Sequence, residues 1–195
     1  MKVGTLACTI SAFVCLFGSA VLCSAQQSDL DAFTKKLAPS VGSPENAVEK
    51  MLQAANLKPG ETLYDLGCGD GRILLRAAKK YRVKAVGIEI SSALAEKAAQ
   101  DVRKKGLQDQ VKIIHGDFMK TNLSAANVVT LYLAPVANDT LRPNLERELK
   151  PQTRVVSYDY PIQGWTPINT WETSGHLGDT HIIYLYEVPN SIIKK

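Results

Sequence analysis

The chain has 195 residues, of which 45% are hydrophobic and 22% are charged, and its formal net charge is +4. This length favours one domain over two, and the composition is that of a globular protein rather than a low-complexity or fibrous one. The mildly basic charge shows no clustered run of Lys or Arg, so it gives no case for a nucleic-acid partner.

Residues 1–25 differ from the rest of the chain. Lys2 precedes a long apolar stretch, and the small residues of "CSA" end it before the polar "QQSD". This order is typical of a signal peptide, so we expect export to the periplasm or secretion, with Ala25 as the last residue removed. The alternative is an uncleaved N-terminal tether to a membrane, because the apolar run approaches the length of a short span.

Cysteine and histidine are too few for a disulfide or a metal site. Three of the four cysteines lie in residues 1–25, so only Cys68 would remain after cleavage. One cysteine and three scattered histidines offer no metal cluster, so we expect no metal and no internal disulfide.

A loose leading segment over residues 26–42 is expected to precede the main domain, which we place at residues 43–190. The first element of that domain is a helix that begins near Ser43, a candidate N-terminal cap. Pro44 suits its first turn, and apolar residues then recur at helical spacing on one face.

Strands and helices then alternate along the chain. Strands are expected at 62–67, 84–90, 110–117, 127–135 and 153–161, and helices at 71–81, 92–106 and 138–150. Two further strands, 168–173 and 181–188, follow each other without a helix between them. The pattern predicts an α/β fold, a Rossmann-like three-layer sandwich. Its mostly parallel seven-stranded sheet would have one antiparallel strand from the C-terminal hairpin.

The turn after the first of these strands carries three glycines in "DLGCGDGR". Gly67, Gly69 and Gly71 let the backbone adopt unusual dihedral angles and approach a ligand closely. Ligands of open parallel sheets bind beyond the carboxyl ends of the strands, where this turn is expected to lie. A tight connection without a ligand is the alternative.

Acidic side chains at the ends of the next strands favour a nucleoside. Glu89 ends the second strand, where a carboxylate can accept hydrogen bonds from ribose hydroxyls. Asp117 ends the third strand and can accept from an adenine amine, with Ile90 and Phe118 flanking the ring.

The spacing of the glycines disfavours a dinucleotide. The third glycine comes one residue earlier than in G-x-G-x-x-G, and Asp65 precedes the first. A carboxylate beside the turn would repel a pyrophosphate but suits a cationic ligand end. This favours S-adenosylmethionine, which carries an ammonium and a sulfonium.

These residues carry a family resemblance. "LYDLGCGDGR", "VGIEIS", "IIHGDF" and the late hairpin resemble the class I, seven-strand S-adenosylmethionine-dependent methyltransferases. More narrowly, "NVVTLYLAP" and "TRVVSYDYPIQGW" look like a subgroup that includes mitochondrial protein-lysine methyltransferases acting on ATP synthase subunit c and the adenine nucleotide translocase. The resemblance implies cofactor contacts at Asp65, Gly67, Gly69, Glu89 and Asp117, and a protein-lysine or other amine substrate.

Two stretches are candidates for the substrate side. "LYLAP" replaces the Asn/Asp-Pro-Pro-aromatic motif of enzymes that methylate amines of nucleic acids, so that substrate is disfavoured; Tyr132 either faces the pocket or lies in the core. In "SYDYPIQGW", an aromatic and acidic wall for an ammonium is one interpretation and a packed loop is the other; the residues concerned are Tyr158, Asp159, Tyr160 and Trp165. Asp159 and Tyr132 are the candidates for catalysis.

Two other interpretations remain open from the residues alone. One is a module that binds S-adenosylmethionine without transferring its methyl group, and the other is a nicotinamide-binding oxidoreductase. The expected partner is a protein or small-molecule amine, and we expect a monomer.

Overall fold

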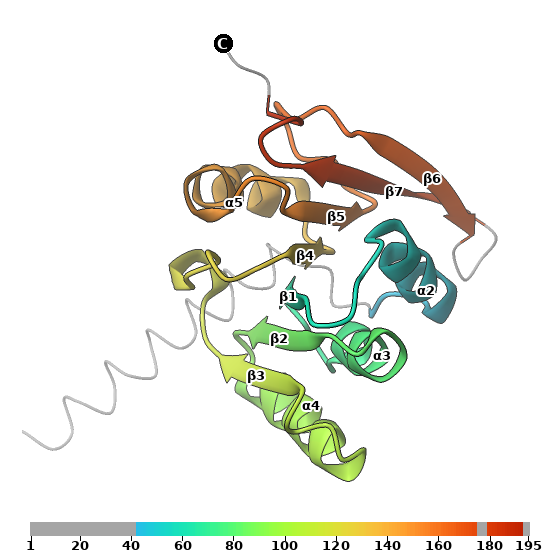
Figure 1. Ribbon diagram of the computed structural model, residues 1–195, viewed down its shortest axis with the longest axis vertical. Coiled ribbons are helices and arrows are strands. Elements are labelled where there is room, and N and C mark those ends of the chain that lie inside the picture. The colour runs from blue at the N-terminus through green and yellow to red at the C-terminus, as the bar shows by residue number, and fades with distance from the viewer. Residues whose placement is uncertain (1–41, 175–178, 193–195) are drawn as a thin grey trace, which may run out of the picture. The chain divides into compact units, whose positions relative to one another are not determined.

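A computed structural model describes residues 42–174 and 179–192. The expected signal or anchor of residues 1–25 and all but the last residue of segment 26–42 lie outside the described residues. The described chain forms a seven-stranded sheet in the order β3-β2-β1-β4-β5-β7-β6 (Figure 1). The strands are β1 (Thr62–Leu66), β2 (Lys84–Glu89), β3 (Val111–His115), β4 (Val128–Leu131), β5 (Arg154–Tyr158), β6 (Asn169–Ser174) and β7 (Thr180–Glu187).

Strands β1 to β5 pair in parallel, whereas β7 runs antiparallel to both β5 and β6. The expected sheet, with one antiparallel strand supplied by the C-terminal hairpin, is therefore confirmed. The antiparallel strand lies next to the edge, and β6 is the edge strand.

Helices cover both faces of this sheet (Figure 1). The helices are α2 (Glu45–Ala54), α3 (Arg72–Tyr81), α4 (Ser92–Lys104), the 3-10 helix η1 (Phe118–Lys120) and α5 (Pro135–Glu148). Buried residues of α2, α3 and α4 share one hydrophobic cluster, and buried residues of η1 and α5 share the other. Two clusters on opposite faces of one sheet make the three expected layers.

The apolar patterns of the sequence explain these layers. All four residues of β4 are buried, as expected of a central strand covered on both faces. In α2, the buried residues recur at helical spacing, so the helix packs one stripe against the sheet: Ala47, Val48, Met51, Leu52 and Ala54.

Several element ends differ from the expectation, and so does one cap. Helix α2 begins at Glu45 without a side-chain cap, so the capping role expected of Ser43 is wrong. Strand β4 stops at Leu131 instead of Pro135, because Pro135 occupies the first turn of α5, where its missing N–H needs no partner. The same helix begins at Pro135 instead of the expected residue 138 and continues through Pro143.

The sheet brings the ends of distant strands to one edge. Parallel pairing places the ends of β1, β2, β3, β4 and β5 side by side, as shown by Leu66 opposite Leu131 and Glu89 opposite His115. Because β7 is antiparallel, its beginning reaches the same edge, with Ile183 opposite Tyr158. The candidate site lies along this edge.

Candidate active site

The glycine turn between β1 and α3 is held against the end of β2. The backbone N–H groups of Gly67 and Cys68 both donate to the carbonyl of Ile88, at 2.9 and 3.0 Å. Gly69 has a φ of +54° and a Cβ built on it would meet nothing within 4 Å, so space lies open above the turn. A positive φ and open space at one residue are what close approach of a ligand to the backbone requires.

Glu89 fixes this turn from the end of β2. Its side chain is buried, and its two oxygens accept from the backbone N–H groups of Gly69 at 2.8 Å and Ser91 at 2.9 Å. Each carboxylate oxygen has a second lone pair, so the group retains capacity to accept from hydroxyl groups of a ligand.

Asp65, at the end of β1, is a carboxyl group almost entirely removed from water. It is 3% exposed, and the hydroxyl of Thr130 donates to its Oδ1 at 2.7 Å. Burial raises the pKa of Asp65 to about 7, against the lowering effect of that hydrogen bond, and the nearby charges of Glu89 and Asp70 raise it further. A buried carboxylate flanked by other acids is stabilised by a cation, so the site fits the cationic end of S-adenosylmethionine.

Asp65→Asn is expected to raise stability and lower cofactor affinity at pH 8. The native pKa of Asp65 lies above its unfolded value, so the folded ligand-free state loses stability as pH rises from about 4 to about 7. The amide cannot ionise and does not contribute to that loss. Losing one charged partner should weaken S-adenosylhomocysteine binding about 10- to 100-fold at pH 8.

Melting and calorimetric titration between pH 5.5 and 8 measure both effects. In the wild type, affinity should rise with pH through about 7, since the ligand's ammonium favours the ionised carboxylate, whereas the Asp65→Asn variant should show a flatter profile. Equal pH profiles in the two proteins would contradict a contact between Asp65 and the cofactor.

The residues expected around an adenine lie at the ends of β2 and β3. Asp117 follows β3, and its Oδ1 accepts from the N–H of Met119 at 2.8 Å, which caps η1. Phe118 is 8% exposed and belongs to the core on the α5 face, and Ile90 is half-buried. The structure thus brings Asp117 to the same edge as Glu89, with one carboxylate oxygen already engaged.

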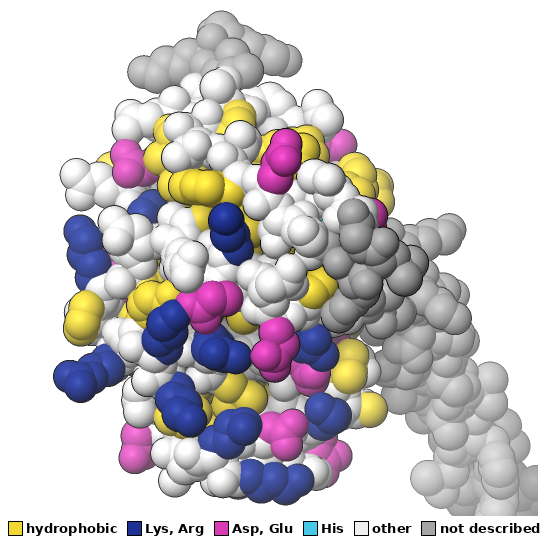
Figure 2. Space-filling view, turned by 90° about the vertical axis from the view of Figure 1, so that its right-hand side faces the viewer, with side chains coloured by type: hydrophobic (Ala, Val, Ile, Leu, Met, Phe, Trp, Pro, Cys, Tyr) yellow, Lys and Arg dark blue, Asp and Glu magenta, His cyan; other side chains and the backbone are white. Residues whose placement is uncertain are grey.

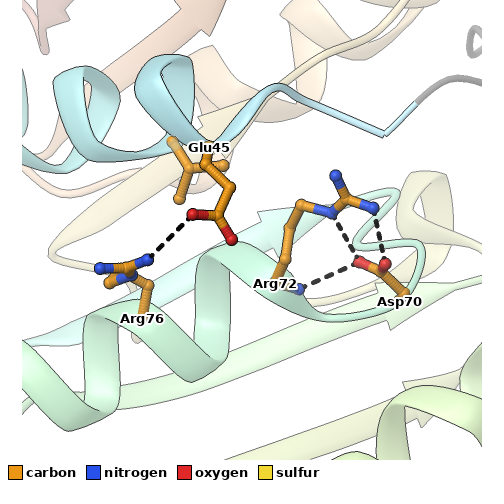
Figure 3. A pocket seen from close by; sticks show the side chains of 5 residues that line it. Glu45, Asp70, Arg72 and Arg76 are labelled. Carbon is orange, nitrogen blue, oxygen red and sulfur yellow. Dashed lines mark hydrogen bonds and ion pairs between the residues drawn. The ribbon is translucent and has the colours of Figure 1, made fainter.

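Arg72 links the glycine turn to the residues before α2, a contact that the sequence analysis missed. Its guanidinium donates twice to Asp70, at 2.9 and 2.7 Å, and once to the carbonyl of Ser43, at 2.9 Å. Figure 3 shows this pair at a cavity. The volume of the cavity is about 280 Å³. The cavity is lined by Glu45, Val48, Asp70, Arg72 and Arg76. In the sequence, the one hint of this contact was the position of Arg72 directly after the third glycine of the turn.

An aromatic cluster with an acid and a histidine lies at the ends of β4 and β5 and the beginning of β7. The ring of Tyr132 meets that of Tyr158 edge-on at 4.7 Å between centroids and stacks with Tyr160 at 6.4 Å. Asp159 contacts the Nδ1 atom of His181 at 2.7 Å. Three of the residues suggested for the substrate side, Tyr132, Tyr158 and Asp159, are thus brought together.

Trp165 is not part of this group. It is 5% exposed in the core cluster on the α5 face, where its Nε1 donates to Glu146 at 2.9 Å and its ring packs edge-on against Tyr186. This placement matches the packed-loop alternative, because its only polar atom is already bonded and its ring faces the core.

Comparison with known proteins identifies relatives of this chain by their sequences. The model of the ANTKMT methyltransferase domain matches residues 65–170. A protein-lysine N-methyltransferase of Saccharolobus islandicus is 41% identical over 152 residues, which cover 77% of this chain and 93% of that protein. The adenine nucleotide translocase lysine N-methyltransferase of Mus musculus is 33% identical over 67% of this chain, which spans 56% of that protein.

A solved structure agrees in fold. It is the crystal structure of a protein described as an RNA methyltransferase, from Salinibacter ruber, in complex with S-adenosyl-L-homocysteine. It is 39% identical, covers 80% of this chain and 98% of that one, and superposes with a TM-score of 0.74.

The fold and the glycine turn with its acidic partners define a class I S-adenosylmethionine-dependent methyltransferase. Within that class, the chain belongs to the family of the ANTKMT methyltransferase domain. Membership of this family excludes the other interpretation of the chain as a nicotinamide-binding oxidoreductase.

The expectation of an exported or membrane-tethered enzyme is wrong. It rested entirely on residues 1–25, which lie outside the described residues. The match to the Saccharolobus islandicus protein extends over 93% of that protein and gives the expectation no support. No helix among the described residues is long and apolar enough to cross a membrane.

Proposed function

We propose that this enzyme methylates the ε-amino group of a lysine in a protein. The observation that carries the proposal is the 41% identity to a protein-lysine N-methyltransferase along nearly all of that protein's length. The translocase-directed relative from Mus musculus supports the same substrate class. The proposed domain spans residues 43–190, and the proposed active form is a monomer.

The proposed cofactor site consists of Asp65, Gly67, Gly69, Gly71, Glu89, Ile90, Asp117 and Phe118. Glu89 would accept from the ribose hydroxyls while it holds the N–H of Gly69, and Asp65 would face the cationic end. When bound, S-adenosylmethionine supplies an activated methyl group, so the protein has mainly to position the acceptor and exclude water.

Surface charge favours a protein substrate over RNA, although the similar protein from Salinibacter ruber is described as an RNA methyltransferase. Asp159, a candidate residue of the substrate side, and the exposed Asp179 both contact His181, so acidic groups gather there. On the face shown in Figure 2, Lys and Arg side chains are interspersed with Asp and Glu. Basic and acidic side chains also pair with each other, as Arg76 does with Glu45 and Lys97 with Asp101. A phosphate backbone binds to continuous basic surface instead.

The experiment is transfer of a labelled methyl group from S-adenosylmethionine into a cell extract, with separate protein and RNA fractions. We expect label in protein, recovered as methyl-lysine after hydrolysis. Label confined to RNA would overturn the proposal and favour a nucleic-acid substrate. Binding of S-adenosylhomocysteine without label in either fraction would favour the non-catalytic module.

A further inference from the structure

Asp159 has a backbone conformation that an aspartate rarely adopts. Its φ is +68°, in the left-handed region, which costs a residue with a side chain free energy and persists where the surroundings determine it. Two contacts hold it: its N–H donates to the carbonyl of Ile182 at 2.7 Å, and its carboxylate meets Nδ1 of His181 at 2.7 Å. The side chain of Asp159 is 18% exposed, so the carboxylate is held in place and still reached from solvent.

His181 lies between two carboxylates. Its Nδ1 contacts Asp159 at 2.7 Å and its Nε2 contacts Asp179 at 2.8 Å. Hydrogen bonding to Asp159, and next the charges of Asp159 and Asp179, raises the pKa of His181. When the imidazole is protonated, both ring nitrogens donate to carboxylates, so this histidine anchors Asp159 and has no free lone pair with which to act as a base. The three charged groups together carry a net negative charge when the imidazole is protonated.

Aromatic rings border this charged group. The imidazole of His181 stacks on the ring of Tyr158 at 5.3 Å, and Tyr158 in turn meets Tyr132. Tyr132 and Tyr160 are half-buried and lie parallel, with 16° between their planes. A carboxylate beside tyrosine faces is the chemistry that binds an alkylammonium, through charge and cation–π attraction.

The hydroxyl of Tyr158 is a second, independent observation that points to a ligand in this cluster. The residue is fully buried, and its oxygen has no hydrogen-bond partner within the described part of the protein. A buried hydroxyl without a partner is costly, and such groups in native proteins need an explanation, of which a bound water or ion and a catalytic role are the usual ones. It belongs to the same cluster of rings as Tyr132 and His181.

We propose that Asp159 and the rings of Tyr132, Tyr158 and Tyr160 bind the ε-ammonium of the substrate lysine, with His181 as the residue that positions Asp159. This inference rests on the proposed function and adds to it the residues that receive the substrate. It assigns His181 a role that its place in the sequence, at the start of a hairpin strand, did not indicate.

The test uses n-butylammonium, the end of a lysine side chain, titrated into the full-length protein saturated with S-adenosylhomocysteine. Ring resonances of Tyr132 and Tyr160 should shift in the wild type, and n-butanol should leave them unchanged. Asp159→Asn should require at least about 10-fold more butylammonium, the loss expected for one charge-assisted partner. His181→Asn should weaken binding less, about threefold to tenfold, because the carboxylate remains but is no longer held.

Asp109→Asn is the matched control, since it removes one negative charge from an exposed turn. It should bind both ligands like the wild type. With a lysine peptide, His181→Asn and Asp159→Asn should raise KM and leave S-adenosylhomocysteine affinity within about twofold, a change too small to reflect loss of one hydrogen bond.

The outcomes separate the two proposals. Absent shifts of the tyrosine rings in the wild type would overturn the ammonium site, whatever the variants do. Unchanged butylammonium affinity in Asp159→Asn would also overturn it, while the cofactor site and the enzyme's activity would stand. Failure of the wild type to bind S-adenosylhomocysteine, in contrast, would overturn the proposed function.

Discussion

Glu89→Ala is expected to weaken S-adenosylhomocysteine binding at least about 100-fold, because it removes two charge-assisted hydrogen bonds of about 1.5–3 kcal/mol each together with the proposed acceptor for ribose. The carboxylate accepts from the N–H groups of Gly69 and Ser91, so the variant leaves both donors without this partner. Gly69 would lose its hydrogen bond to β2 at the place where the ligand must fit, while those of Gly67 and Cys68 to Ile88 would remain. Calorimetric titration measures the affinity.

A graded series tests this explanation. Glu89→Gln keeps one oxygen that can accept, so its affinity should lie between those of the wild type and Glu89→Ala. Glu96→Ala is the control, because Glu96 is exposed on α4 and contacts only Gln100 among the hydrogen bonds of the described residues. Affinity of Glu89→Ala within threefold of the wild type would exclude Glu89 from the cofactor site.

The parts of the site that could be predicted from the sequence are those that depend only on where a residue lies in its own strand or turn. Asp65, the glycines and Glu89 each lie at the end of a buried strand or directly after it, and parallel strands end at one edge whatever the details of packing. The alternation of apolar strands with helices was sufficient to predict the layers and the parallel sheet. No side-chain contact had to be known for these predictions.

The parts that could not be predicted depend on contacts between distant segments. His181 meets Asp159 only because β7 is antiparallel to β5 in a register that sets Ile183 opposite Tyr158. Arg72 reaches the carbonyl of Ser43, 29 positions earlier in the chain. Sequence patterns predict which face of an element is buried, but not which side chains meet across two elements.

Trp165 and residues 1–25 show a different limit. An aromatic residue near an acidic one looks the same in sequence whether it binds a ligand or fills a core, and Trp165 packs in the core. An apolar N-terminal stretch similarly predicts export from composition alone, without reference to the enzyme that follows it. For Trp165 the residue type was informative, and its packing in the core decided the outcome.

Gly87 shows how tightly the glycine turn is packed onto β2. Its backbone needs no special dihedral angle, but a Cβ built on it would lie 2.6 Å from Sγ of Cys68 and 2.4 Å from Cδ1 of Leu74. Both neighbours are buried, Cys68 within the turn itself and Leu74 in α3. Cys68 therefore serves as a small side chain that fits over a glycine, and burial raises the pKa of its thiol.

Gly87→Ala is accordingly expected to destabilise the protein by about 1–3 kcal/mol, the usual result of overpacking a core. For a chain of this size that lowers the melting temperature by roughly 2–12 °C. The added methyl group pushes Cys68, so the turn moves and S-adenosylhomocysteine affinity should fall as well. Thermal melting with and without the ligand measures both effects.

Matched variants show whether the loss of stability comes from the contacts of the added methyl group with Cys68 and Leu74. In Gly116→Ala the new Cβ would come no closer than 3.7 Å to Ile114, an ordinary contact, so the melting temperature should hardly change. Cys68→Ala removes one of the two clashing atoms and leaves Cδ1 of Leu74 in place, so the double variant Cys68→Ala with Gly87→Ala should lose less stability than the two single variants' losses added together. Additive losses in the double variant would contradict the contact, since residues that share a clash must couple when both are changed.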